Sequence, residues 1–83
     1  MKYLVITRRT PRFRTEVLQE HYAFLADLRI RRQLETSGPF GDGSGGAYVL
    51  IANTLDEARK LAFSDPLHVQ HCSVLEILEW RAM

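Results

Sequence analysis

The sequence has a single cysteine and no long run of apolar residues. Cys72 therefore cannot form a disulfide within the chain. No apolar stretch approaches the roughly 20 residues that a membrane-spanning helix needs. Met1 leads directly into a short apolar segment, without the basic region and longer apolar core of a signal peptide. These features favour a protein of the reducing cytoplasm and give no reason to expect a membrane partner.

An excess of charge of one sign is also lacking. The net charge is +1, so no overall field attracts nucleic acid or an anionic membrane, and we expect neither as a partner. The charges are unevenly divided, however. Residues 1–33 carry eight basic and three acidic side chains, a net charge of +5, and residues 34–83 carry three basic and seven acidic ones, a net charge of −4. We expect these groups to pair across one compact domain or to be solvated.

The length and composition predict one small globular domain, residues 1–83. Hydrophobic residues make up 46% of the chain and charged residues 25%, which are ordinary values for a folded protein. A domain of this size buries only about 60–65% of its unfolded surface, so its stability alone is marginal. A second subunit that covers apolar surface would relieve this.

The order of the predicted elements indicates an α+β fold of the ferredoxin-like type, βαββαβ. Segments rich in β-branched and aromatic residues predict strands, and segments with a helical apolar stripe predict helices. Along the chain these are a strand at 2–7, a helix starting near Thr10-Pro11 or Thr15 and ending near Arg32, strands at 34–40 and 48–52 joined by a glycine-rich turn at 41–46, a helix from Thr54 to Asp65-Pro66, a short turn, and a strand at 73–80. This plan gives a four-stranded antiparallel sheet with two helices on one face.

Two helices can cover only one face of such a sheet. The first, third and fourth predicted strands nevertheless carry apolar residues on both faces. A large exposed apolar face is unusual for a monomer, so we expect a second copy of the chain to cover it and predict a homodimer.

His21 lies in the middle of the apolar stripe of the first predicted helix, which also contains Val17, Leu18, Leu25 and Leu28. An imidazole in such a place must find a hydrogen-bond partner or open to a cavity. Taken alone, the pattern is more often that of a core histidine with a satisfied hydrogen bond than that of a functional group.

Asp65 extends the apolar face of the second predicted helix, which presents Leu55, Ala58, Leu61 and Ala62. An aspartate before proline is a good N-cap for the turn that follows. The same carboxylate could also hold a ring N–H of His21, which would fix the imidazole tautomer and leave the other nitrogen as a base. Without a nucleophilic serine or cysteine, such a pair suits proton abstraction better than acyl transfer.

Several motifs in this order resemble the YCII-like family of dimeric α+β barrels. They are His21 with Tyr22, Leu25 and Leu28, then Thr36-Ser37-Gly38-Pro39, then the glycine-rich hairpin, then Ser64-Asp65-Pro66, and finally Glu79-Trp80. The sequence departs from the family's usual pattern at Gln33, Leu67 and His71-Cys72.

The resemblance implies a dimeric barrel with the helix histidine and the aspartate of the Asp-Pro pair, His21 and Asp65, as the active site. Relatives of the family include a dehydrochlorinase that acts on a chlorinated hydroxyquinol. More distant barrels of this architecture include muconolactone isomerases. Most members of the family have no assigned reaction.

Other candidate groups carry weaker signals. His68 and His71 have a spacing of three residues beside Cys72, but two histidines outside a clear helix make a poor metal site, and we expect none. The glycines at 41–46 lack the Lys-Ser/Thr ending of a phosphate-binding loop. A cluster of arginines is either a solvated edge or the mouth of a site for a carboxylate or phenolate: Arg8, Arg9, Arg12 and Arg14.

Three functional hypotheses follow. In the first, the chain is an enzyme without a cofactor, a lyase or isomerase, in which His21 and Asp65 move a proton of a small anionic compound. In the second, the same pocket binds a small molecule without catalysis. In the third, the chain is a dimerisation module that needs no ligand.

Overall fold

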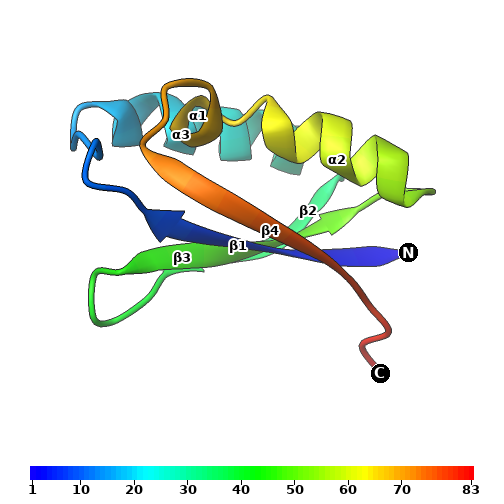
Figure 1. Cartoon of the computed structure of the whole chain (residues 1–83). Coiled ribbons are helices and arrows are strands. Elements are labelled where there is room, and N and C mark those ends of the chain that lie inside the picture. Colours follow the sequence, from blue (N-terminus) through cyan, green and yellow to red (C-terminus); the bar gives the residue numbers. More distant parts are fainter.

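The computed structural model describes residues 1–83 and contains four strands and three helices (Figure 1). In chain order they are β1 (Lys2–Arg9), α1 (Val17–Ile30), β2 (Leu34–Pro39), β3 (Gly45–Ile51), α2 (Leu55–Phe63), α3 (Pro66–Val69) and β4 (Ser73–Trp80). None of the helices is long and apolar enough to cross a membrane.

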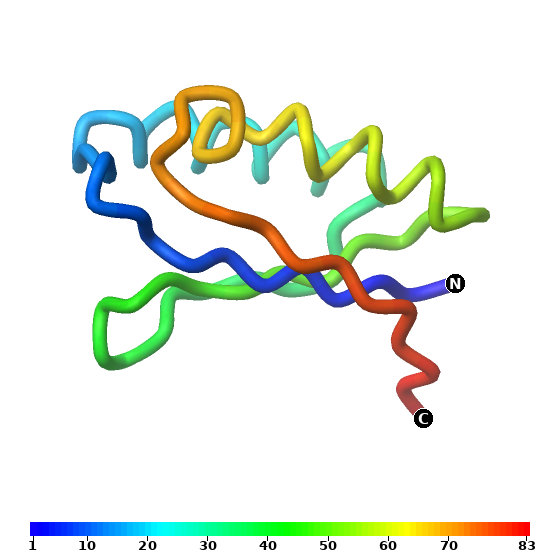
Figure 2. Tube along the Cα trace, viewed as in Figure 1, coloured from blue at the N-terminus to red at the C-terminus, as the bar shows by residue number.

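The four strands form one sheet in the order β2-β3-β1-β4, and every neighbouring pair is antiparallel. All three helices lie on the same face of this sheet, and the other face carries none (Figure 1). Both chain termini lie at the same end of the molecule, opposite the turn that joins β2 and β3 (Figure 2). The predicted ferredoxin-like arrangement is confirmed.

Alternate residues of the central strands build the core between sheet and helices. Tyr3 and Val5 of β1 and Leu50 of β3 are almost fully buried, and Tyr3 lies opposite Leu50 in the sheet register. Leu25 and Leu28 of α1 belong to the same cluster of buried residues. The period of two in a strand and the period of about 3.6 in a helix therefore place these side chains in one layer.

The helix ends follow the capping signals of the sequence. Thr54 Oγ1 accepts a hydrogen bond from the Glu57 N–H at 3.1 Å, and the Glu57 carboxylate accepts one from the Asn53 N–H at 3.3 Å. At the next boundary the Asp65 side chain caps α3 by accepting from the Leu67 N–H at 2.9 Å. The sequence predicted only a turn here, because a four-residue helix is too short to show a periodic pattern.

Three other sequence expectations were wrong in detail. Helix α1 begins at Val17, close to the predicted start near Thr15, but the alternative start at Thr10-Pro11 was wrong, because the Thr10 hydroxyl accepts from the Arg12 N–H and donates to the His71 carbonyl. Leu55, expected on the buried face of α2, is 39% exposed at the first turn of that helix. Strand β3 begins at Gly45, inside the predicted turn.

Gly45 can occupy this strand position only because it lacks a side chain. Its φ is +156°, and a Cβ there would lie 1.8 Å from the Thr7 carbonyl oxygen of β1. Strand β3 thus approaches β1 at Gly45 more closely than a residue with a side chain at this position would allow. This approach leaves a stretch of bare backbone at the end of the sheet where the α1 helix begins.

The face of the sheet that carries no helix is largely apolar. Leu4 lies opposite Leu78 on this face, and Lys2 lies opposite Trp80. Val74, Leu78 and Trp80 are 59%, 43% and 47% exposed. These strands therefore present apolar side chains that no part of the chain covers.

We predict that Leu28→Ala lowers the free energy of unfolding by about 2–5 kcal/mol, the usual cost of truncating a buried leucine. Leu28 is 2% exposed against the sheet. Ile30, two residues further on, is 81% exposed, so Ile30→Ala should change the free energy by less than about 0.5 kcal/mol. Urea unfolding of both variants checks this, and equal effects would contradict the assigned buried face of α1.

Candidate functional site

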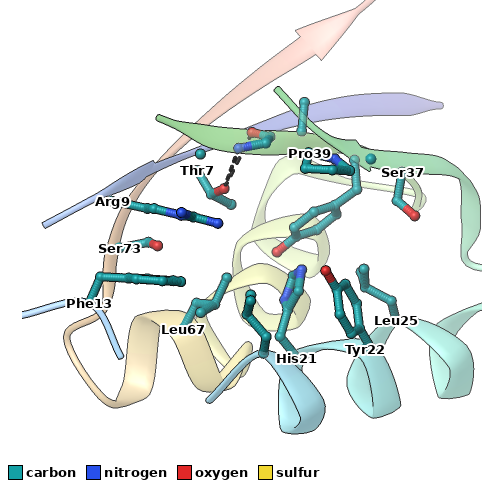
Figure 3. A pocket seen from close by; sticks show the side chains of 16 residues that line it. Thr7, Arg9, Phe13, His21, Tyr22, Leu25, Ser37, Pro39, Leu67 and Ser73 are labelled. Carbon is teal, nitrogen blue, oxygen red and sulfur yellow. Dashed lines mark hydrogen bonds between the residues drawn. The ribbon is translucent and has the colours of Figure 1, made fainter. Parts of the chain in front are cut away.

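A cavity of about 190 Å3 lies between α1 and the end of the sheet where β1 ends and β3 begins. Its walls include Arg9, Phe13, His21, Tyr22 and Ser73 (Figure 3). Gly45 and Gly46 of β3 line it as well. Side chains of the helices and of the β1 end surround the rest of the space.

The structure brings His21 and Asp65 together, as the sequence predicted. His21 Nδ1 and Asp65 Oδ1 are 2.9 Å apart, although 44 positions separate the two residues in the chain. His21 projects from the middle of α1, and Asp65 lies between α2 and α3. The His21 side chain is 11% exposed and that of Asp65 is fully buried. Helices α1 and α3 pack side by side, and this packing brings the two residues into contact.

The Asp65 carboxylate accepts hydrogen bonds from three separate elements. Oδ1 lies 2.9 Å from both His21 Nδ1 and the Leu67 backbone nitrogen, and Oδ2 accepts from the Tyr48 hydroxyl at 3.0 Å. A buried carboxylate is costly unless its oxygens are satisfied in this way. The predicted double role of Asp65, as helix cap and histidine partner, is thus present in one side chain.

Tyr48 is a member of this network that sequence analysis missed. It is 2% exposed and lies on β3, where its ring faces the helices. Burial raises the pKa of its phenol, and the Asp65 charge and their hydrogen bond raise that pKa further. The phenol therefore stays protonated and remains a donor. A buried tyrosine needs a hydroxyl partner, and that rule was the one signal in the sequence that could have drawn attention to Tyr48.

This network defines what the imidazole can do. With the Asp65 carboxylate as acceptor we assign the ring hydrogen to Nδ1, which leaves Nε2 of His21 as the free acceptor. His21 makes no other hydrogen bond, and in Figure 3 its ring points from α1 into the cavity. An imidazole oriented by a carboxylate and facing a cavity can take a proton from a bound molecule and give it back.

The other histidines and the cysteine do not join this site. The His68 ring stacks against Phe63, with ring centroids 4.8 Å apart. The His71 side chain is exposed, and its backbone has a φ of +60°. Cys72 is fully buried in a separate small cluster with Val17 and Leu67. No three His, Cys, Asp or Glu side chains are grouped closely enough to hold a metal ion.

The arginine cluster is divided by the fold. Arg9 lines the cavity, where its guanidinium carbon lies 4.0 Å from the centre of the Phe13 ring. Arg8, its neighbour on β1, pairs with Glu76 at 3.0 Å. Arg14 forms an exposed ion pair with Glu16 at 3.6 Å. Only one member of the cluster thus faces the site, while the other contacts are surface pairs of small energetic value.

Tyr48 should make stability depend on alkaline pH. The pKa of the Tyr48 phenol is near 10 in the unfolded chain and higher in the folded protein. The contribution of Tyr48 to the free energy of unfolding is therefore fully present below about pH 10 and is lost as the pH rises toward the folded-state pKa. We predict that the free energy of unfolding of the wild type falls more steeply above about pH 10 than that of Tyr48→Phe, by about 1.4 kcal/mol per pH unit.

Urea unfolding between pH 8 and 11.5 measures this difference. The pKa of Tyr3 is also raised by burial, with contributions from Glu79 and Glu57, and both proteins retain this tyrosine. The comparison therefore isolates Tyr48. Parallel curves for the two proteins would show that the phenol titrates normally and is not held by Asp65.

Comparisons with known proteins agree with the fold. Residues 1–81 match the family model described as a YCII-related domain. The chain is 43% identical over 79 residues to the uncharacterized protein YjpA of Bacillus subtilis (strain 168). The matched segment covers 95% of this chain and 93% of that protein. It also resembles the structure of 5-chloro-2-hydroxyhydroquinone dehydrochlorinase (TftG) from Burkholderia phenoliruptrix AC1100 in complex with 2,5-dihydroxybenzoquinone, with a TM-score of 0.72 and 18% identity over 98% of this chain and 94% of that chain. The latter likeness concerns the fold, and the match of nearly the whole chain to the family model establishes that this protein belongs to the YCII family.

Proposed function

We propose that the protein is an enzyme in which His21, oriented by Asp65, abstracts a proton from a small anionic organic compound in an elimination or an isomerisation. The observation that carries this proposal is the hydrogen bond of 2.9 Å between His21 Nδ1 and the buried Asp65 carboxylate beside an open cavity. The fold it shares with a dehydrochlorinase supports the same type of chemistry.

The proposed reaction uses His21 Nε2 as general base. This nitrogen takes a proton from a C–H or O–H of the substrate, and the electron pair left behind forms a new double bond. In an elimination, chloride then leaves with the electrons of its own bond, and solvent later removes the proton from His21. In an isomerisation, the protonated imidazole returns the proton to another carbon of the same molecule.

Asp65 and Tyr48 serve as positioning residues in this proposal. Asp65 holds Nδ1–H, so that Nε2 faces the cavity, and its negative charge stabilises the imidazolium that forms when the proton arrives. Tyr48 donates to the second oxygen of Asp65 and keeps the carboxylate from rotating away. The chemistry needs no cofactor, because a single imidazole can move the proton in both directions.

The test is turnover of chlorinated hydroxyquinols and muconolactone-like compounds. We expect one of these classes to react, and His21→Ala to lower kcat/KM by about 10²- to 10⁴-fold, the usual contribution of a general base. His68→Ala is the matched control, because His68 stacks on Phe63 outside the cavity and should leave the rate unchanged. A full rate in His21→Ala would contradict the proposal, and saturable binding with no turnover by the wild type would support a non-catalytic binding module.

We also propose that the protein is a homodimer in which two sheets pack through their faces without helices. Support comes from the uncovered apolar side chains Val74, Leu78 and Trp80 of β4 and from Ile51 of β3, which is 40% exposed and lies across Lys2 of β1 from Trp80. Helices occupy only the opposite face, so a second copy can approach this one directly (Figure 1). A stable interface of this kind buries more than about 1,200 Å2 in total.

We predict a dimer at micromolar concentration and a monomer for Leu78→Glu, because burying that charge in the interface is costly. Val69→Glu introduces the same charge on α3, where Val69 is 60% exposed on the helical side, and should remain a dimer. Light scattering coupled to size exclusion measures both masses. A monomeric wild type would exclude this arrangement.

A further inference from the structure

Arg9 is a cation of the cavity that no carboxylate neutralises. The guanidinium stacks on the Phe13 ring at 4.0 Å but forms no ion pair, whereas neighbouring Arg8 pairs with Glu76. Stacking uses the flat face of the guanidinium and leaves the N–H groups at its edge free to donate. Arg9 therefore presents unused donors and an unpaired positive charge at the wall of the cavity that His21 faces (Figure 3).

Ser73 supplies a second unused donor at the same wall. It is 4% exposed, lines the cavity, and its hydroxyl has no hydrogen-bond partner within the protein. In Figure 3 the Ser73 side chain is drawn next to the stacked side chains of Arg9 and Phe13, on the same wall of the cavity. An unpaired buried hydroxyl is costly and uncommon in native proteins, so its presence calls for a partner that is not part of the chain.

Thr7 shows that the same environment can satisfy a hydroxyl when a backbone partner is available. Thr7 Oγ1 donates to the Gly46 carbonyl at 3.3 Å and accepts from the Gly46 N–H at 3.0 Å. Thr7 lines the cavity as Ser73 does, but its hydroxyl hydrogen is already donated to the Gly46 carbonyl and is not free for a ligand. Ser73 is thus the buried hydroxyl of the cavity that has no hydrogen-bond partner within the protein.

The size of the cavity limits what such a ligand can be. A cavity of about 150 Å3 holds a benzene molecule in another protein, so the space of about 190 Å3 here fits one ring with a few substituents. The rings of Phe13, Tyr22 and Tyr48 are among its walls, and they suit a flat molecule. The ligand must also place an anionic oxygen at the wall that contains Arg9.

We propose that Arg9 and Ser73 form an anion subsite that binds the carboxylate, phenolate or enolate oxygen of a small planar ligand, with the reacting hydrogen of that ligand directed to His21. The Arg9 edge donates to the anionic oxygen. Ser73 Oγ is shielded from solvent in the free protein, and it donates to the same oxygen once the Arg9 side chain turns toward the ligand. Only the stacking on Phe13 holds the guanidinium, so this turn breaks no hydrogen bond.

This subsite deepens the proposed function, since it assigns the substrate class of the same cavity, and its test measures binding alone. The probes are benzoate and its neutral analogue benzamide, titrated calorimetrically into the wild type. Benzoate should bind at least tenfold more tightly than benzamide. Arg9→Met should weaken benzoate binding by about tenfold to a hundredfold, the range for a charge-assisted hydrogen bond, and should leave benzamide binding nearly unchanged.

Two further variants separate the subsite from general effects. Arg12→Met removes the same charge from an exposed residue outside the cavity and should leave benzoate binding unchanged. Ser73→Ala should weaken benzoate binding without lowering the unfolding midpoint, because the hydroxyl has no partner in the free protein. A merely structural serine would show the reverse.

The outcomes distinguish this inference from the catalytic proposal. Absence of saturable benzoate binding, equal affinity for benzoate and benzamide, or equal losses in Arg9→Met and Arg12→Met would each overturn the subsite. Binding of benzoate that depends on Arg9, together with no turnover of any tested compound, would uphold the subsite and reject the catalytic proposal. Turnover that needs His21 but is unchanged in Arg9→Met would uphold the catalysis and reject the subsite.

Discussion

The buried carboxylate of Asp65 is the interaction on which this structure depends. It accepts hydrogen bonds from the Leu67 N–H in the first turn of α3, from the His21 imidazole of α1 and from the Tyr48 hydroxyl of β3. One side chain therefore joins three elements that lie far apart in sequence. Each contact also removes part of the cost of burying the charge. Folding and site geometry therefore cannot be separated at this residue, and the loss of its charge would alter both the helix packing and the orientation of His21.

Sequence patterns predicted the fold because each element carries its own signal. Three of these signals are local: the apolar stripe of α1, the Thr54 cap with Glu57, and the Asp65-Pro66 boundary. Local features can be recognised in the sequence without knowledge of tertiary contacts. The errors fall where tertiary contacts decide. Strand β3 extends into the glycines because β1 lies beside them, and the four residues of α3 become helical only around the Asp65 cap.

The candidate site was predictable only in part for a related reason. His21 is conspicuous as a polar residue on an apolar stripe, and the family resemblance suggested Asp65 as its partner. Tyr48 gave no such signal, because an aromatic residue in a strand is ordinary. Arg9 was one arginine among several, and only the direction of β1 and the position of Phe13 distinguish it from Arg8.

The bare backbone at Gly45 and Gly46 has a consequence for how such a pocket can diversify. The floor consists of main-chain atoms held by the pairing of β3 with β1, and substitution cannot easily reshape it, since a Cβ at Gly45 would collide with Thr7. The walls, by contrast, come from side chains such as Phe13 and Tyr22, which lie outside the sheet. A scaffold built this way can change the shape of its pocket by altering the rim, while its rigid base and its hydrogen-bonded pair of His21 and Asp65 stay as they are.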